Sequence, residues 1–344
     1  MARTRVVYWN TACLEPSIEA VSKELFELAA HFPDSRLFAV SPHLGFRRED
    51  GGRVLGFHPR WDLTLRLLIP WVERGARISH VYSDPSPWLF HRTLRRRPLV
   101  WTVATEAGRL LEPFADRCRV VVAQTEGFRR RLREAGLPED RLRWIPPGID
   151  LDRFRPSASR PEGGPRLLFA SAPRSAEELE ARGVPLLIDA ARQAPEMSVR
   201  LLYRQWRSGY TSLAPTEEAV RGLANVELVR ESVKDMAGEY PGHHFTVIPY
   251  TTPDGGKECP NSLLEGMACG VPALVSDAAP FAEYVRQHGC GEVFEPTPAG
   301  LAVAVERGLA RWDERSRAAR TAAERDFDRR VTLRRYEEVY DGLE

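Results

Sequence analysis

The chain has 344 residues, which is long enough for two domains of ordinary size. Hydrophobic residues make up 43% and charged residues 28%, so sizeable cores are expected and disorder is excluded as the main state. A formal net charge of +1 excludes the overall basicity typical of nucleic-acid-binding proteins. The sequence contains neither an apolar run of about 18 residues nor a signal-peptide core, so we expect a cytoplasmic protein without a membrane-spanning helix.

Charge is unevenly distributed along the chain. Residues 1–158 contain 26 Lys and Arg against 19 Asp and Glu, so the remaining residues are acidic on balance. This asymmetry favours an anionic partner for the first half, although drift in surface charge explains it equally well. The arginine clusters 95–97 and 129–131 could contact anionic lipid, phosphate or a polymer, the alternative being solvated helix faces.

The first half of the sequence alternates short β-rich runs with helical patterns. Strands are expected over Arg5–Trp9, Arg36–Val40, Ile78–Tyr82, Pro98–Val103, Arg119–Ala123 and Leu142–Ile145. Helices are expected over Ile18–Ala30, Asp62–Arg74 and Glu126–Ala135, with Pro70 kinking or ending the second. This alternation predicts a parallel sheet with helices on both faces, which binds ligands at the carboxyl ends of its strands.

Residues 156–165 are rich in proline, glycine and serine, and the alternation restarts after them. We therefore expect a first domain over 1–158, a linker over 159–165, a second domain over 166–320 and a helix over 321–344 that could cross back to the first domain. Strands are expected over Arg166–Ala170, Val199–Tyr203, Val226–Val229, Phe245–Pro249 and Ala273–Val275. Helices are expected over Val184–Gln193, Asn261–Cys269 and Ala299–Trp312. The predicted fold is α/β, with two Rossmann-like doubly wound domains facing a central cleft.

Polar residues follow several strands of the first domain. The candidates for a binding edge there are Asn10, Asp84, Thr105 and Glu106. Ordinary turn chemistry explains Asp84 equally well, because an Asp-Pro pair favours a turn. Cysteines offer no further site, since the five are scattered without a Cys-x-x-Cys pair. They indicate reduced thiols and no structural metal.

Residues 257–277 carry the most chemical information. Pro260 lies near the first turn of a short helix, Gly270 ends this helix, and a buried strand follows. The amides of Asn261, Ser262 and Leu263 would be free at the helix N-terminus, where free amides and the helix dipole bind phosphate. Glu265 lies one turn further on and suits the paired hydroxyls of a ribose. The alternative is an ordinary capped helix with a surface glutamate.

Three segments resemble the family 4 retaining glycosyltransferases of GT-B architecture. Leu-Glu-Gly-Met-Ala-Cys-Gly-Val-Pro at 264–272 is similar to that family's Leu-Glu-Ala-Met-Ala-Cys-Gly-x-Pro. Val-Ala-Gln-Thr-Glu at 122–126 resembles its Ala-x-Ser-Glu helix start. Residues 145–156 resemble its interdomain segment, with Pro147 where Asn is usual. The likeness is clear over about residues 120–300 and weak over the first 110.

The resemblance implies a nucleoside-diphosphate sugar bound by the second domain and an acceptor bound by the first. Glu265 corresponds to the family's ribose-binding glutamate, and 261–263 would hold the diphosphate. Arg174 and Arg182 correspond to the family's Arg and Lys that neutralise the leaving diphosphate, Arg182 preceding Gly183 as the Lys precedes Gly. The alternative for each arginine is a solvated loop.

The sequence departs from the family pattern at three places. Lys257 stands where the first glutamate of the Glu-x7-Glu motif is expected, and Glu258 is one residue late. Either Glu258 contacts the donor sugar, or Lys257 takes over and changes sugar preference, or catalysis is weakened. Ala104 replaces a common histidine. The Gly-Gly pair of the first loop is missing from 10–17.

These motifs predict a retaining, metal-independent transferase that moves a hexose-type sugar from a nucleoside-diphosphate sugar to an acceptor hydroxyl. No cofactor is expected besides the donor, and the acceptor is expected to be anionic or lipid-linked. The first domain could touch the inner face of a membrane. Two alternatives stay open: a non-catalytic GT-B partner subunit, and a sugar-nucleotide epimerase or hydrolase of the same fold.

Overall fold

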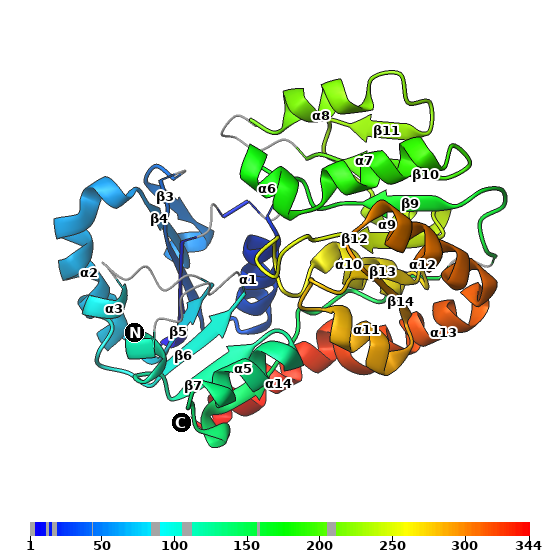
Figure 1. Ribbon diagram of the computed structural model, residues 1–344. Coiled ribbons are helices and arrows are strands. Elements are labelled where there is room, and N and C mark those ends of the chain that lie inside the picture. Colours follow the sequence, from blue (N-terminus) through cyan, green and yellow to red (C-terminus); the bar gives the residue numbers. More distant parts are fainter. Residues whose placement is uncertain are drawn as a thin grey trace. The chain divides into compact units, whose positions relative to one another are not determined.

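The computed structural model describes residues 4–11, 14–15, 19–42, 44–83, 90–104, 112–156, 159–204 and 211–344 (Figure 1). The chain forms two compact units. Unit 1 comprises Met1–Pro146 and Thr332–Glu344, and unit 2 comprises Pro147–Val331. The first domain was expected to end at residue 158, whereas the compact units divide after Pro146, and the C-terminal residues belong with unit 1.

Unit 1 is built on an eight-stranded sheet in the order β3-β4-β2-β1-β5-β6-β7-β8. Its strands are β1 (Thr4–Asn10), β2 (Arg36–Val40), β3 (Arg47–Glu49), β4 (Val54–Phe57), β5 (Ala76–Tyr82), β6 (Leu99–Val103), β7 (Val120–Ala123) and β8 (Leu142–Trp144). Every neighbouring pair is parallel except β3 and β4. The chain first builds outward from β1 through β2, then restarts on its other side at β5. The point where the strand order reverses therefore lies between β1 and β5.

Helices cover both faces of this sheet, as the sequence predicted. They are α1 (Ala20–His31), α2 (Asp62–Arg74), α3 (Phe90–Thr93), α4 (Glu112–Ala115), α5 (Glu126–Glu134) and α14 (Arg329–Asp341). One core contains Leu25 and Leu28 of α1 with Tyr336 and Tyr340 of α14. The other contains buried residues of α2 and α5. Short 3₁₀ turns occupy Asp50–Gly52, Pro59–Trp61 and Glu139–Arg141.

A buried polar network joins α14 to the sheet. The His80 ring of β5 makes hydrogen bonds of 2.6 Å with Tyr340 Oη and 2.8 Å with Thr102 Oγ1. Tyr336 Oη lies 3.0 Å from the same Thr102 hydroxyl. Burial lowers the pKa of His80 to about 3, so its imidazole stays neutral at ordinary pH. The C-terminal helix is thus part of the interior of unit 1.

Helix α2 has the expected bounds and does not end at Pro70, because Ile69 and Val72 on either side of the proline are buried in the same core. Two short strands of unit 1 differ from the sequence expectations. The strands β3 and β4 were not predicted. Strand β3 consists of three charged residues and β4 contains a glycine, so neither has the β-rich composition by which the other strands were recognised.

Unit 2 contains a six-stranded parallel sheet in the order β11-β10-β9-β12-β13-β14. Its strands are β9 (Arg166–Phe169), β10 (Ser198–Leu202), β11 (Val226–Val229), β12 (Phe245–Ile248), β13 (Ala273–Ser276) and β14 (Gly291–Phe294). Strand β9 sends Leu167 and Phe169 into one core and Leu168 into the other, which is the alternation of a strand buried on both faces. Strand order reverses between β9 and β12, so this sheet is also doubly wound.

The helices of unit 2 form a layer on each face of the sheet (Figure 1). They are α6 (Ala176–Ala181), α7 (Val184–Gln193), α8 (Leu213–Val220), α9 (Met236–Glu239), α10 (Asn261–Ala268), α11 (Ala282–His288), α12 (Pro298–Ala310) and α13 (Trp312–Ala322). A 3₁₀ turn follows at Tyr240–Gly242 and a π-helical turn at Ala323–Phe327. Buried residues of α7 and α12 share one core, and those of α10, α11 and α13 share the other. Within the described residues no helix is both long and apolar enough to cross a bilayer.

Candidate nucleotide-sugar site

The carboxyl ends of β9 and β12 lie side by side in the sheet of unit 2, at the point where its strand order reverses. Ligands of doubly wound sheets bind in the crevice that forms at such a point. Residues 170–175 follow β9, residues 249–260 follow β12, and α10 begins directly afterwards. All the donor-side residues predicted from the sequence belong to these segments or to the helices that continue them.

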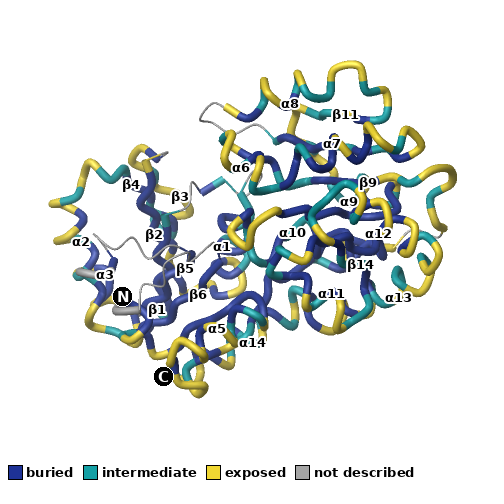
Figure 2. Tube along the Cα trace, in the orientation of Figure 1, coloured by how far each residue is buried: buried dark blue, intermediate teal, exposed yellow. Residues whose placement is uncertain are grey.

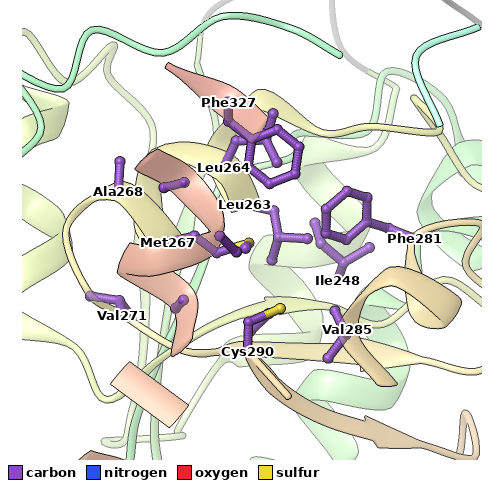
Figure 3. Packing of buried hydrophobic residues seen from close by; sticks show 14 of the residues in the cluster. Ile248, Leu263, Leu264, Met267, Ala268, Val271, Phe281, Val285, Cys290 and Phe327 are labelled. Carbon is purple, nitrogen blue, oxygen red and sulfur yellow. The ribbon is translucent and has the colours of Figure 1, made fainter. Parts of the chain in front are cut away.

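Helix α10 is held by its buried face. Leu263, Leu264, Met267 and Ala268 pack into a core that also contains Phe327, as Figure 3 shows. Gly266 lets the helix approach β12 closely, because a Cβ there would lie 2.2 Å from Thr246 Oγ1. The helix N-terminus is therefore fixed on the sheet by packing along the whole helix.

The first turn of α10 leaves two amides without an acceptor. Pro260 precedes the helix and supplies no side-chain cap. The Leu263 amide donates to Pro260 O at 3.0 Å, so the expectation of a free amide at Leu263 is wrong. A tight first turn causes this, because it closes with a bond between residues three apart. Within the described part of the chain no acceptor is recorded for the Asn261 and Ser262 amides, which leaves these two for an anion.

Lys257 adds a positive charge at this helix end. Its Nζ donates to Asn261 Oδ1 at 2.7 Å, which places the ammonium group beside the first residue of α10. The buried Asn261 Nδ2 has no hydrogen-bond acceptor within the described residues. An ammonium group, a helix dipole and an amide donor all favour an anion here. Glu258 is half-buried beside Lys257, and Cys259 after it is fully buried.

Glycines bring the end of α6 against the segment that follows β12. A Cβ at Gly255 would lie 2.4 Å from Ala181 O, and one at Gly256 would lie 2.4 Å from Tyr250 Oη. Gly183 is closer still, since its Cβ would lie 1.9 Å from Pro249 O. These approaches place Arg182 and the segment leading to Lys257 at the same edge of the sheet.

Arg182 is held in place by fixed acceptors. Its Nη1 donates to Ser171 Oγ at 3.0 Å and to the carbonyl oxygens of Ser171 and Ala172 at 3.2 Å. Its Nη2 lies 3.1 Å from Glu178 Oε2, and 13% of its side chain is exposed. The buried Arg182 Nε has no acceptor among the described residues. The guanidinium is therefore pre-positioned beside the segment that follows β9.

Arg174 contacts the same Glu178 carboxylate as Arg182. Its Nε donates to Glu178 Oε1 at 3.0 Å, and its backbone amide donates to Glu178 Oε2 at 2.9 Å. In contrast to Arg182, 58% of its side chain is exposed. Glu178 thus joins the two arginines that were predicted to neutralise a diphosphate. Glu178 could not be singled out from the sequence, since nothing in its spacing marks a carboxylate that pairs with both arginines.

Gly183 offers a stability test of this arrangement. It has a φ of +69°, so an alanine there would meet both backbone strain and the Pro249 carbonyl. We expect Gly183→Ala to lower the free energy of unfolding by about 3 kcal/mol. Gly222→Ala is the matched control, since Gly222 has a φ of +79° with nothing within 4 Å of its Cβ position. Its loss should be about 1 kcal/mol in urea denaturation, and equal losses would contradict the close approach.

Glu265 is a buried carboxylate rather than a surface one. It is 8% exposed, and Tyr240 Oη donates to its Oε2 at 2.8 Å. Burial, reinforced by the neighbouring Glu265 charge, raises the pKa of Tyr240 well above its usual value, so the phenol remains a donor. This bond orients the carboxylate from the turn that precedes β12. The alternative of an ordinary solvated glutamate is therefore wrong.

The acceptor-side predictions fall mostly outside the described residues. Asp84, Thr105 and Glu106 all lie there. Asn10 ends β1 as expected, but it is fully buried and its Nδ2 donates to Phe38 O at 3.4 Å. Asn10 thus contacts the neighbouring strand β2 at the carboxyl end of β1.

Unit 1 also has a buried carboxylate, near the carboxyl ends of its strands. Glu24 of α1 accepts hydrogen bonds from Tyr82 Oη at 2.6 Å and Gln124 Nε2 at 2.8 Å. Tyr82 ends β5 and Gln124 follows β7, so their positions at strand ends could have marked them. Glu24 could not be found in this way, because it lies within a helix. Among the described residues no group of three His, Cys, Asp or Glu side chains is placed to hold a metal ion.

Fold and site together define the class of protein: two doubly wound units, with a helix that begins at the switch point of the second, are typical of the GT-B architecture. The family model "Glycosyl transferases group 1" matches residues 165–311, and the model "Glycosyltransferase Family 4" matches residues 26–153. The chain belongs to this family of glycosyltransferases, and the recognition from the sequence motifs is confirmed.

Several curated proteins are similar to part of this chain. D-inositol 3-phosphate glycosyltransferase of Geodermatophilus obscurus is 28% identical over 240 residues, which are 64% of this chain and 50% of that protein. The GDP-mannose-dependent alpha-(1-6)-phosphatidylinositol monomannoside mannosyltransferase of Mycobacterium tuberculosis is 26% identical over 210 residues, or 57% of this chain and 53% of that protein. The chain spans about half the length of these relatives.

Solved structures share the fold over the whole chain. Anabaena HepE in complex with UDP and glucose has a TM-score of 0.77 at 15% identity, with 99% of this chain and 100% of that chain covered. A glycosyltransferase from Rickettsia africae has a TM-score of 0.75 at 14% identity, with 99% and 98% covered. These likenesses confirm the predicted GT-B fold.

Proposed function

We propose that the protein is a retaining, metal-independent glycosyltransferase that moves a hexose-type sugar from a nucleoside-diphosphate sugar to an acceptor hydroxyl. The observation that carries this proposal is that Arg182, Lys257 and the N-terminus of α10 lie at the same carboxyl edge of the sheet of unit 2, where its strand order reverses. Three sources of positive potential lie at this edge, as a leaving diphosphate requires. No cofactor besides the donor is needed.

In the proposed reaction the C1–oxygen bond of the donor breaks, and the diphosphate keeps the electron pair. Arg182, Arg174 and the amides of Asn261 and Ser262 stabilise its growing negative charge. A new C1–oxygen bond forms with the acceptor hydroxyl on the same face of the sugar, and the hydroxyl proton passes to the leaving phosphate. No protein nucleophile is assigned. Glu265 holds the ribose hydroxyls with a carboxylate that Tyr240 already orients.

The segment before α10 is proposed to read the donor sugar. Lys257 stands at the position of the first glutamate in the Glu-x7-Glu motif that the sequence resembles, and its Nζ donates to Asn261. A cation at this point favours a donor whose sugar or phosphate presents negative charge, with Glu258 available to accept from neutral hydroxyls. The relatives' names support an acceptor that carries an inositol phosphate or a lipid-linked sugar. Such an acceptor would be met by the N-terminal unit at the inner face of a membrane.

The proposal is tested by ligand-dependent thermal unfolding with uridine, guanosine and adenosine diphosphates and their common sugar conjugates. A ligand at a hundredfold excess over Kd stabilises the native state by about 2.7 kcal/mol, so one nucleotide should raise the melting temperature clearly. With that donor, transfer in the presence of EDTA and an NMR assignment of the product anomer test metal independence and retention. No shift with any nucleotide would contradict the donor site.

One observation favours a second candidate, a non-catalytic GT-B partner protein. Glu178 pairs with both arginines and Asn261 pairs with Lys257, so each cation already has a protein partner. Nucleotide binding without transfer or donor hydrolysis would support that candidate. Hydrolysis or epimerisation without transfer would instead indicate another reaction on the same fold.

A further inference from the structure

One carboxylate accepts from both arginines beside the segment that follows β9. Glu178 of α6 accepts Arg174 Nε at 3.0 Å through Oε1, and it accepts the Arg174 backbone amide at 2.9 Å through Oε2. The same Oε2 lies 3.1 Å from Arg182 Nη2. Two guanidinium groups and a backbone amide are donors of the kind that bind a phosphate group in proteins. The carboxylate of Glu178 therefore occupies the place of an anion.

The two sides of the Arg182 guanidinium have different partners. Nη1 donates to Ser171 Oγ and to the Ser171 and Ala172 carbonyl oxygens, at distances between 3.0 and 3.2 Å. These acceptors hold Arg182 whether or not Glu178 contacts it. Nη2 pairs with Glu178, and the buried Nε has no acceptor among the described residues. Because Nε and Nη2 form the fork that binds two oxygens of one anion, Glu178 satisfies only half of this fork.

The Glu178 side chain can leave both arginines while α6 stays in place. Leu179 anchors α6 in a core of unit 2, and Ser175 Oγ accepts the Glu178 amide at 3.2 Å. The rest of the helix lies at the surface, as Figure 2 shows. Since 27% of the Glu178 side chain is exposed, rotation about its own bonds suffices to turn the carboxylate into solvent.

The alternative is that Glu178 only caps its helix. Ser175 and Glu178 have the spacing of a capping box, in which the third residue of the helix accepts an amide at the helix start. Here that amide belongs to Arg174, one residue before the cap. A cap needs no contact with Arg182, and a glutamine serves in it as a glutamate does. The negative charge of Glu178 is therefore what separates the two roles.

We propose that Glu178 is a resident counter-ion that the diphosphate of the donor displaces and that returns when the nucleoside diphosphate leaves. In the free protein its charge offsets the repulsion between Arg174 and Arg182. Once a diphosphate is bound, the carboxylate faces another anion and turns into solvent. Glu178 thereby lowers the affinity for the diphosphate and speeds the release of the product, a step that limits the turnover of many enzymes. The inference rests on the proposed diphosphate site, but its test needs neither nucleotide nor transfer.

Isothermal titration with inorganic pyrophosphate tests the proposal. Glu178→Gln removes the charge and keeps an acceptor for the cap. It should bind pyrophosphate about tenfold more tightly than the parent, since removing a neighbouring like charge at a protein surface changes affinity by this order. Glu314→Gln is the matched control, because Glu314 also lies in the first turn of a helix and pairs with Arg311, which belongs to no predicted site. Its affinity should equal that of the parent.

Two further measurements locate the effect. Most of the gain should disappear when Arg182→Gln is added to Glu178→Gln, because the fork that the pyrophosphate takes over is then absent. Pyrophosphate should also raise the melting temperature of Glu178→Gln more than that of the parent. This comparison holds even where the variant is less stable without ligand, since each protein is its own reference.

Three results would overturn the proposal. Equal affinity of Glu178→Gln and the parent would leave Glu178 as a helix cap, and weaker binding by the variant would make it a residue that positions the arginines for the anion. If neither protein bound pyrophosphate, no anion would displace the carboxylate. The donor site is judged separately, by the response of the parent to nucleotides, so the two proposals can fail independently.

Discussion

Replacing Glu265 by alanine is expected to abolish the stabilisation that the cognate nucleotide gives to the native protein. The carboxylate is 8% exposed and oriented by Tyr240, which fits its proposed role as acceptor for two ribose hydroxyls. Losing two charge-assisted hydrogen bonds weakens binding by about 3 kcal/mol or more, which is at least a hundredfold in Kd. The measurement is isothermal titration or ligand-dependent unfolding with the nucleotide that stabilises the parent.

The same variant should also be less stable without ligand. Removing the carboxylate leaves Tyr240 Oη buried without this acceptor, which costs about 1–3 kcal/mol. Tyr240→Phe separates the two effects, because it removes the hydroxyl while keeping the carboxylate. Its nucleotide affinity should fall only a few-fold. If Glu265→Ala bound nucleotide as tightly as the parent, the assignment of the ribose contact would be wrong.

Replacing Arg182 by glutamine should lower the transfer rate at saturating donor by about a hundredfold to a thousandfold. Arg182 is fixed by Ser171, Ala172 and Glu178, so its charge is already in place when the leaving diphosphate becomes more negative. A fixed donor of this kind acts more strongly on the transition state than on the bound donor, so kcat should fall more than affinity.

Two further variants isolate that effect. Arg192→Gln is the matched control, since Arg192 of α7 is 51% exposed and contacts Asp189 and Ala219 O, neither of which is a predicted site residue. It should transfer sugar at the parent rate. Arg182→Lys should recover part of the lost rate, because the charge returns without the planar fork that reaches several acceptors. Equal activity of Arg182→Gln and the parent would remove Arg182 from the mechanism.

The longer elements of both units could be predicted from the sequence because their apolar periodicity extends over many residues. Strand β2 and helix α7 have the bounds that were expected, and α2 does so despite its proline. Short elements were recognised less regularly: β11 was expected with its exact bounds, whereas others were missed. Strand β14 and helix α11 follow each other within 13 residues, so neither shows enough periods to be recognised.

The candidate site could be predicted only in the part whose residues are contiguous in the sequence. The N-terminus of α10 and Glu265 could be located because the helix start and its glutamate are adjacent in the sequence. The hydrogen-bond partners of the site residues could not be located in this way. Tyr240 lies 25 residues before Glu265, and Ser171 lies 11 residues before Arg182. Each contact spans a whole element, β12 between Tyr240 and Glu265 and α6 between Ser171 and Arg182, and no local pattern in the sequence marks such a pair.

The position of α14 has a consequence for the order in which the protein matures on the ribosome. Tyr336 and Tyr340 close a polar interior whose other members, Thr102 and His80, are synthesised more than 230 residues earlier. Unit 1 therefore cannot complete its interior until unit 2 has left the exit tunnel, whereas unit 2 depends on no later segment than Val331. During elongation one face of the N-terminal sheet therefore stays partly uncovered until α14 packs on it. This interval is when nascent chains are most in need of a chaperone.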